Sequence, residues 1–473
     1  MCSTKLLSHV RGQRVSINQD NILSKPPVTL GILTRVPGST EVFVAELDGR
    51  KVIAVFSNSG HQRGAFRQDD GAKISRAAVL SKENLLPLVL VLSTSGASIS
   101  DGISALASWG KAAKAMAEIS GIVPIIIGLT GPAISGPALL LGLADIVIST
   151  IDSYAYVSGP SMVEEFTGVK TSNIELGGSH IQASRSGVTA LEVAGHSEII
   201  ESISEVLSYL PNSTNSLPKR TDNTDDPNRS CPSLSTVIPV SPTGSYDVRT
   251  IIEELSDNGE YLELRAKWAP QIVTCLTRIG GRSVGILANQ PQAMAGTLDI
   301  QASQKGAKFV RFCSGFNLPL ITLVDTPGFL PGKDIEWRGM IRHGAELAFS
   351  YAACSVPRIC VILRKAYGGA YIVMDSKGMG SDIVFAWPQA EIAVMGAQGA
   401  AQILMRRASD DERLAYQESY RETYLTPWIA AERGFVDAVI DPASTRAEIN
   451  AALEILITKK ERVRPSKHAN SPL

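Results

Sequence analysis

Short runs of apolar residues recur along the chain and are separated by longer segments with helical spacing of apolar positions. Two of the runs lie at 87–92 and 319–324 and consist mainly of Leu, Val and Ile. A strand that is buried on both faces of a parallel sheet reads as such a continuous apolar run. The segments 103–119 and 340–353 have the length and pattern of helices. The alternation therefore predicts an α/β fold with a largely parallel sheet.

The pattern of runs occurs twice, at an offset of about 232 residues. The matched segments are 49–53 with 281–286, 87–92 with 319–324, and 123–127 with 356–362. A repeat of this length predicts two tandem copies of one α/β unit.

The segment after residue 210 is rich in Asn, Ser, Thr, Asp and Pro, as is typical of a connection between domains. We therefore predict a first domain at 25–210, a linker at 211–235 and a second domain at 236–473.

A glycine-rich turn follows an apolar strand in the second copy, within the segment 364–374. The amides at the start of a helix have no partner inside that helix, and glycine lets a ligand approach the backbone. Gly369 and Ala370 are therefore candidate donors to a negatively charged oxygen. The turn at 325–332 follows the preceding strand and is expected to add further donors.

The first copy has the same layout at 93–98 and 131–137, where Gly136 matches Gly369. Tight packing also selects glycine at such turns, but a turn repeated at matched positions favours function. Two candidate oxyanion sites follow from the two copies, although this pattern does not name the reaction.

Composition and motifs exclude several other classes of protein. A formal net charge of -1 gives no electrostatic reason to expect nucleic acid or an anionic membrane as a partner. The six cysteines form no CxxC pair, and no signal peptide or membrane-spanning run is found, so we expect a cytoplasmic protein. No serine elbow, Walker loop or clustered metal ligands occur, so we expect no metal. Main-chain electrostatics remain as the principal catalytic device.

The second half carries a series of motifs in order along the chain. They lie at 289–291, 298–300, 305–313, 327–332, 341–345, 364–371, 386–396 and 467–473. With these motifs the chain resembles the carboxyltransferase (β) subunits of biotin-dependent acyl-CoA carboxylases, the propionyl-CoA and acetyl-CoA carboxylase type.

The resemblance implies two tandem crotonase-like domains, with the acyl acceptor bound by the first and biotin by the second. The implied reaction moves CO2 from carboxybiotin, on a separate carrier protein or domain, to the α-carbon of an acyl thioester such as acyl-CoA. Charge then develops on oxygen in both reactants, which explains a need for two oxyanion holes. The implied partners are a biotin carboxylase, a biotin carboxyl carrier (α) subunit and further copies of the chain. These copies would form a homohexamer in which two subunits share each active site.

The resemblance also assigns roles to residues of this sequence. The catalytic backbone groups would be those of Gly369, Ala370, Ser135 and Gly136. Biotin would contact Tyr367, Gly368, Gly328 and Phe329. The acyl substrate would contact Ser95, Gly96, Ala97 and Ile372. At the position of Ile372, relatives that prefer propionyl-CoA often carry Asp, and relatives that accept a wider range of acyl groups carry Ile. Ile372 therefore favours a roomy acyl pocket over a simple core contact.

The first half departs from the family pattern where CoA is usually bound. Ser135 still offers an amide, whereas Pro137 does not. An unusual acceptor, an ordinary but divergent acyl-CoA carboxylase, and a biotin-dependent decarboxylase all remain open. So do a non-catalytic structural partner of an active β subunit and a biotin-independent hydratase or hydrolase of the crotonase type.

Overall fold

The computed structural model describes residues 38–57, 59–60, 62–241 and 243–459. The chain divides into two units between Leu217 and Pro218, which lies inside the predicted linker. The later part of that linker packs with the second unit, because Cys231 and Leu234 are buried in its core. The first residues of the predicted first domain, 25–37, lie outside the described residues, as does the motif at 467–473.

The first unit is built on a seven-stranded sheet in the order β1-β2-β3-β4-β5-β7, with β6 paired to β4. β1 and β2 are antiparallel, and the other pairs are parallel. The strands are β1 Thr40–Leu47, β2 Arg50–Ser57, β3 Leu88–Thr94, β4 Ile125–Ile134, β5 Ile146–Thr150, β6 Tyr154–Tyr156 and β7 Leu191–Val193. The helices are α3 Gln68–Asn84, α4 Ile103–Ile119, α5 Leu140–Leu143, α6 Pro160–Thr167, α7 Asn173–Gly177, α8 Ser179–Ile181 and α9 His196–Tyr209.

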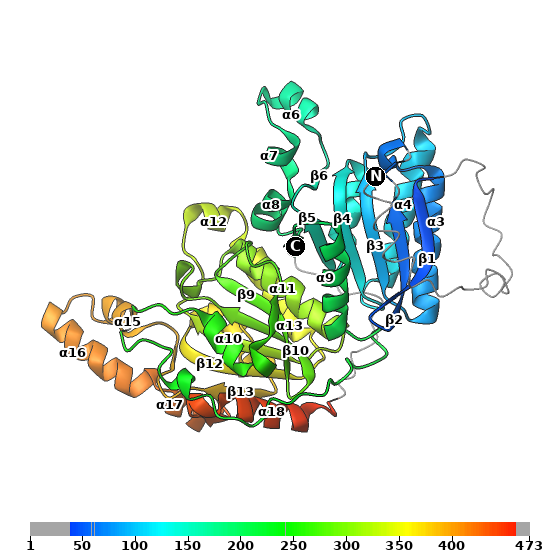
Figure 1. Cartoon of the computed structure of the whole chain (residues 1–473). Coiled ribbons are helices and arrows are strands. Elements are labelled where there is room, and N and C mark those ends of the chain that lie inside the picture. Colours follow the sequence, from blue (N-terminus) through cyan, green and yellow to red (C-terminus); the bar gives the residue numbers. More distant parts are fainter. Residues whose placement is uncertain (1–37, 58, 61, 242, 460–473) are drawn as a thin grey trace. The chain divides into compact units, whose positions relative to one another are not determined.

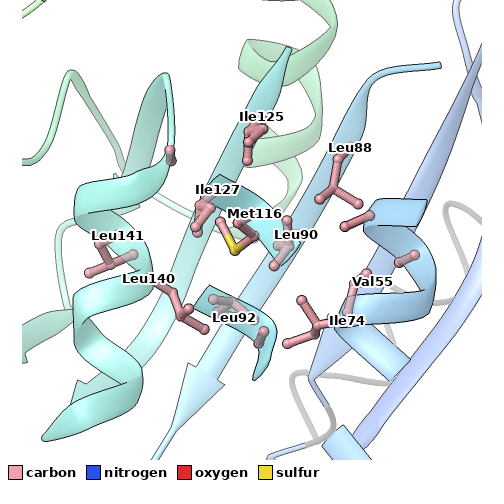
Figure 2. Packing of buried hydrophobic residues seen from close by; sticks show 14 of the residues in the cluster. Val55, Ile74, Leu88, Leu90, Leu92, Met116, Ile125, Ile127, Leu140 and Leu141 are labelled. Carbon is pink, nitrogen blue, oxygen red and sulfur yellow. The ribbon is translucent and has the colours of Figure 1, made fainter. Parts of the chain in front are cut away.

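Helices cover both faces of the first sheet. Alternate residues of β3 and β4, such as Leu90 and Ile127, pack against Ile74 of α3 and Met116 of α4, as Figure 2 shows. On the opposite face, α9 lies against β4, where a Cβ on Gly128 would meet Ile199 at 2.5 Å. Because every residue of β3 is buried, the strand is continuously apolar rather than alternating.

The second unit has an eight-stranded sheet in the order β15-β13-β12-β11-β10-β9-β8, with β14 paired to β12. The strands are β8 Tyr261–Glu263, β9 Ile272–Ile279, β10 Arg282–Asn289, β11 Leu320–Thr326, β12 Arg358–Tyr367, β13 Ile383–Ala386, β14 Glu391–Ala393 and β15 Ala438–Val439. The helices are α10 Val248–Leu255, α11 Ile300–Gly315, α12 Lys333–Trp337, α13 Met340–Ala352, α14 Gly368–Val373, α15 Ala397–Leu404, α16 Asp410–Tyr420, α17 Pro427–Glu432 and α18 Thr445–Leu456. Figure 1 labels most of these elements on the chain.

The α/β prediction is confirmed, and so are the two helices named from the sequence pattern. The predicted helix at 103–119 is α4, and the helix predicted at 340–353 is α13, which ends one residue earlier. Both sheets are mixed rather than purely parallel, because each begins with antiparallel strands at one side. Hairpins of this kind connect through short turns and need no crossover helix.

The repeat extends to irregular features of the backbone. Three consecutive residues have positive φ angles of 46°, 53° and 71° at 62–64, and 49°, 53° and 72° at 294–296. The pairing of β3 with β4 shifts register between Leu92 and Thr94, and that of β11 with β12 shifts between Val324 and Thr326. Shared irregularities of this kind show that both copies hold their strand ends and turns in the same way.

None of the helices in the described part of the chain is both long and apolar enough to span a membrane.

Candidate active site

The second-unit turn lies where β12 ends and α14 begins. Gly368 has a φ of 58°, and a Cβ there would lie 3.1 Å from the carbonyl oxygen of Val394. Glycine is therefore favoured both by the backbone angle and by the close approach. Gly369 and Ala370 follow in the first turn of α14, where their amides have no carbonyl partner within the helix. Gly369 is exposed.

The turn after β11 lies directly beside this helix start. A Cβ built on Gly369 would be 3.5 Å from the Phe329 ring, and one on Gly344 of α13 would be 3.3 Å from the same ring. Gly328 precedes Phe329 with a φ of 147°, outside the range that other residues readily adopt. The structure therefore brings together Gly328, Phe329 and Gly369, which the sequence placed in one subsite.

Tyr367, the last residue of β12, belongs to the same group but its hydroxyl is already bound. It donates a hydrogen bond to the Glu391 carboxylate on β14. Burial and this carboxylate raise the pKa of Tyr367, so the phenol stays protonated at neutral pH. The ring and backbone of Tyr367 remain for contact with a ligand, while its hydroxyl serves to fix the ring.

The first-unit turn differs from the prediction in one respect. Ser135 has a φ of 61°, and its amide donates to the carbonyl oxygen of Tyr156 at 2.9 Å. The expectation that this amide is open to an oxyanion is therefore wrong, because the pairing of β4 with β6 continues through it. Pro137 has no amide, which leaves Gly136 as the candidate donor of this turn. A Cβ on Gly136 would lie 2.6 Å from the Trp109 ring, which excludes any side chain there.

The predicted acyl-contact residues of the first unit lie next to this turn. A Cβ on Gly96 would be 3.3 Å from the carbonyl oxygen of Ile134 and 3.7 Å from the Cβ of Ser135. The amide of Ser95 donates to the Arg63 carbonyl oxygen at 3.2 Å. Ala97 forms a parallel bridge with Phe66. Residues 95–97 are thus fixed to the loop at 62–66.

Ile372 lies on α14 and is 45% exposed. Ile372 therefore does not simply fill the core of its own chain. It belongs to the second unit, whereas the other predicted acyl-contact residues, 95–97, belong to the first.

A family model described as the carboxyl transferase domain matches residues 45–471. The chain belongs to the carboxyl transferase family.

Relatives within this family cover most of the chain. The methylmalonyl-CoA decarboxylase subunit alpha of Veillonella parvula is 40% identical over 428 residues, which is 90% of this chain and 84% of that protein. The propionyl-CoA carboxylase carboxyltransferase subunit of Haloferax mediterranei is 39% identical over 448 residues, or 93% of this chain and 87% of the relative. A crystal structure of transcarboxylase 12S, a hexamer assembly with methylmalonyl-coenzyme A and methylmalonic acid bound, is 38% identical with a TM-score of 0.90. It aligns over 92% of this chain and 85% of that one.

These similarities confirm the family resemblance and the two crotonase-like halves. The chain is an enzyme of the biotin-dependent acyl-CoA carboxylase and transcarboxylase group. Its relatives also include a decarboxylase subunit.

Sequence reasoning missed a buried polar group at the base of the second-unit turns. Asp325, the second-last residue of β11, is 1% exposed and accepts hydrogen bonds from Tyr246 Oη at 2.8 Å and Arg364 Nε at 3.0 Å. Burial raises the pKa of Asp325, and the neighbouring Arg364 acts in the opposite direction. The signal was present, since a charged residue, Asp325 or Arg364, directly follows the apolar run of each of two adjacent strands. Carboxyl ends of parallel strands meet at one edge of a sheet, so the two charges had to be close.

Within the described residues, no group of three or more His, Cys, Asp or Glu side chains is arranged to hold a metal ion. The described cysteines are buried, and burial raises the pKa of each thiol. A thiolate nucleophile is disfavoured at such positions.

Proposed function

We propose that this chain moves a carboxyl group between carboxybiotin, carried on a separate protein, and the α-carbon of an acyl thioester, with acyl-CoA as the first substrate to test. The observation that carries the proposal is the second-unit turn. It combines the exposed residue Gly369 and the neighbouring Ala370, whose amides have no partner within α14, with the Phe329 ring in one place.

The chemistry requires that negative charge be stabilised on oxygen. When the acyl group is carboxylated, the bond from biotin N1 to the carboxyl carbon breaks and a bond from the α-carbon to that carbon forms. The α-carbon gives up its proton, and biotin N1 receives it. Charge appears on the ureido oxygen of biotin and on the thioester oxygen, so fixed backbone donors lower the barrier without a protein acid or base.

The second unit supplies the biotin subsite in this proposal. The amides of Gly369 and Ala370 would donate to the ureido oxygen, and the rings of Phe329 and Tyr367 would cover the bicyclic ring system. Support comes from the packing of Phe329 against Gly369 and from the hydrogen bond that fixes Tyr367. Gly328 and Gly368 would let the cofactor approach the main chain.

The first unit supplies the acyl subsite. The amide of Gly136 would donate to the thioester oxygen, and residues 95–97 would line the acyl-CoA. Ser135 contributes through its exposed side chain and its backbone shape, because its amide is bound to Tyr156. Ile372 would border the acyl chain and leave room for more than one chain length.

The relatives suggest propionyl-CoA and methylmalonyl-CoA as the first pair of substrates, and they leave the direction open. A methylmalonyl-CoA decarboxylase subunit and a propionyl-CoA carboxylase subunit match the chain at nearly the same identity, 40% and 39%. Carboxylation and biotin-dependent decarboxylation run in opposite directions and would use the same backbone donors, so the assay has to follow both directions.

The proposal includes partners. A biotin carboxylase and a biotin carboxyl carrier (α) subunit would supply and receive the carboxyl group. Copies of the chain would form a homohexamer, in line with the hexamer assembly of transcarboxylase 12S. Each active site would combine the first unit of one copy with the second unit of another, so an isolated monomer would be inactive.

The test is a reconstituted transfer assay. The chain is mixed with a biotinylated carrier, biotin carboxylase, ATP, labelled bicarbonate and a panel of acyl-CoA thioesters, and label in each thioester is measured. Transfer that depends on biotin supports the proposal. A parallel reaction starts from labelled methylmalonyl-CoA with uncarboxylated carrier, and label moving to the carrier identifies the reverse direction. If no label moves in either assay and the chain binds another β subunit stably, it is a structural partner. Turnover without biotin would identify a hydratase or hydrolase instead.

A further inference from the structure

The two copies have the same shift in strand register just before their glycine-rich turns. The side chains at the shift differ between the copies. In the second unit the shifted residue is Asp325, between Val324 and Thr326. In the first unit it is Ser93, between Leu92 and Thr94.

In the second unit, Asp325 joins the ends of two strands through three donors. Its carboxylate accepts from Tyr246 Oη at 2.8 Å, from Arg364 Nε at 3.0 Å and from the Lys365 amide at 3.0 Å. Arg364 also donates to the Gly244 carbonyl oxygen at 2.7 Å. Its guanidinium carbon lies 5.2 Å from the centre of the Tyr246 ring. We call this group the Asp325 clamp; it consists of Asp325, Arg364 and Tyr246.

The first unit forms the same register shift without such a clamp. Ser93 stands at the position of Asp325, and Gly131 and Pro132 stand at the positions of Arg364 and Lys365. A Cβ on Gly131 would lie 2.5 Å from Ser93 Oγ, so the serine occupies the space beside the glycine. Pro132 has no amide to donate.

The comparison within one chain shows that this fold does not need the clamp to make the shift and the turn. A buried ion pair generally stabilises a fold little compared with small or apolar groups in its place, because both charges lose water. The presence of the clamp therefore points to a role of the second unit that the first unit does not share.

We propose that the Asp325 clamp positions the two turns of the biotin subsite relative to each other. Asp325 is directly followed by the turn that carries Gly328 and Phe329, and Arg364 leads into the turn that carries Gly369 and Ala370. The bonds of the clamp join the bases of both turns, so they set the spacing between the Phe329 ring and the Gly369 amide. Asp325, Arg364 and Tyr246 are positioning residues, and none of them is assigned a contact with the substrate. The inference rests on the proposed function for the identity of the ligand only.

Hydrogen exchange and kinetics test the proposal together. The variant Asp325→Ser/Arg364→Gly gives the second unit the pair found in the first, and Tyr246→Phe removes a single donor. We expect the double variant to fold, with backbone amide exchange in 326–332 and 366–372 faster by about fivefold or more. Its kcat for carboxyl transfer should fall roughly 100-fold, since small errors of alignment cost about that much. The KM for acyl-CoA should change much less than kcat, because the assigned acyl contacts other than Ile372 lie in the first unit. Tyr246→Phe should show the same changes in smaller degree.

Arg249→Gln is the matched control. Arg249 forms an ion pair with Glu263 at 2.7 Å in the same unit but is not part of the clamp. This variant should leave exchange in both segments and kcat at the wild-type level.

The outcomes separate this inference from the proposed function. Unchanged exchange and unchanged kcat in a folded double variant would overturn the inference. So would a double variant that fails to fold while Tyr246→Phe keeps wild-type exchange and kcat, because the clamp would then serve the fold alone. If the wild type transfers no label at all, the proposed function fails, and the exchange experiment still decides whether the clamp holds the two turns.

Discussion

Ser135 and Gly368 occupy equivalent positions in the two copies and share almost the same backbone angle, a φ of 61° in Ser135 and 58° in Gly368. Each directly precedes the glycine of its turn, Gly136 or Gly369. A side chain at Gly368 would meet the Val394 carbonyl oxygen, whereas Ser135 carries its side chain into solvent. The first copy thus keeps the shape of the turn with a residue that is poorly suited to it.

Ser135→Gly should stabilise the chain. With φ 61° and ψ -145°, Ser135 lies in a region that is nearly exclusive to glycine, where other residues cost about 1–3 kcal/mol. Glycine also gives the unfolded chain more conformational freedom, which lowers the free energy of unfolding by about 0.4–1 kcal/mol. We expect a net gain of about 1 kcal/mol, measured from the urea midpoint of unfolding. Gly368→Ser is the reciprocal change and should destabilise. A loss of stability in Ser135→Gly would show that its side chain makes a compensating contact.

Ala370→Pro should abolish most of the transfer activity with little change in fold. The substitution removes one amide of the second-unit turn, and Pro137 occupies the matched position of the first unit, so the architecture accommodates proline there. Loss of one oxyanion donor typically lowers kcat by about 100-fold or more. Carboxyl transfer from the biotinylated carrier is the measurement, with thermal unfolding to monitor the fold. Ala370→Gly keeps the amide and is the control. A folded Ala370→Pro variant with full activity would remove this amide from the mechanism.

The sequence was sufficient for the fold because its evidence was local and duplicated. The apolar runs and the repeat predicted the strands, and they placed the turn at Gly369 after β12 and the turn at Gly136 after β4. The engagement of the Ser135 amide was not predictable, because it depends on Tyr156, which pairs through β6 after an intervening helix and strand. The link from Tyr246 to Asp325 was also beyond the sequence, since 79 residues separate the two and only the folded sheet brings them together.

Phe329→Ala should weaken the productive binding of the biotinylated carrier. The ring packs between Gly369 and Gly344, and burial of an aromatic side chain against a ligand contributes about 1.5–3 kcal/mol. We expect the KM for the carrier to rise roughly tenfold while the KM for acyl-CoA stays constant. Steady-state kinetics with each substrate varied in turn provide the measurement. Phe316→Ala is a control for the loss of a buried ring elsewhere in the second unit. Equal changes in both KM values would contradict a role in the biotin subsite.

Ile372→Asp should narrow the range of acyl chains that the enzyme accepts. Ile372 is 45% exposed on α14, so a polar side chain there should change stability by less than about 1 kcal/mol. A carboxylate in the acyl pocket is costly to desolvate against a longer apolar chain. We expect kcat/KM to fall more for butyryl-CoA than for propionyl-CoA, in a comparison of both substrates with both proteins. Ile372→Val keeps the apolar character and should keep the wild-type ratio. An unchanged ratio in Ile372→Asp would place the residue outside the pocket.

Lys305→Met should destabilise the second unit, and by an amount that depends on pH. Lys305 is 1% exposed, and its Nζ lies 2.6–3.4 Å from four carbonyl oxygens, those of Arg265, Trp268, Ala269 and Ile272. Removal of these donors leaves buried acceptors unsatisfied and should cost about 3 kcal/mol or more.

The pH dependence follows from the lowered pKa of the same amine. Burial lowers the pKa of Lys305 from 10.5 to about 7. Between these values the unfolded chain binds more protons than the folded chain, so the contribution of Lys305 to stability rises with pH through this window. Urea unfolding from pH 7.5 to 9.5 should show the difference between wild type and Lys305→Met growing by roughly 1 kcal/mol per pH unit. Lys73→Met is the control, since Lys73 holds the Thr40 carbonyl oxygen at the matched place of the first unit but is partly exposed. A difference that stays constant over this range would mean that the carbonyl oxygens keep Lys305 charged in the folded chain.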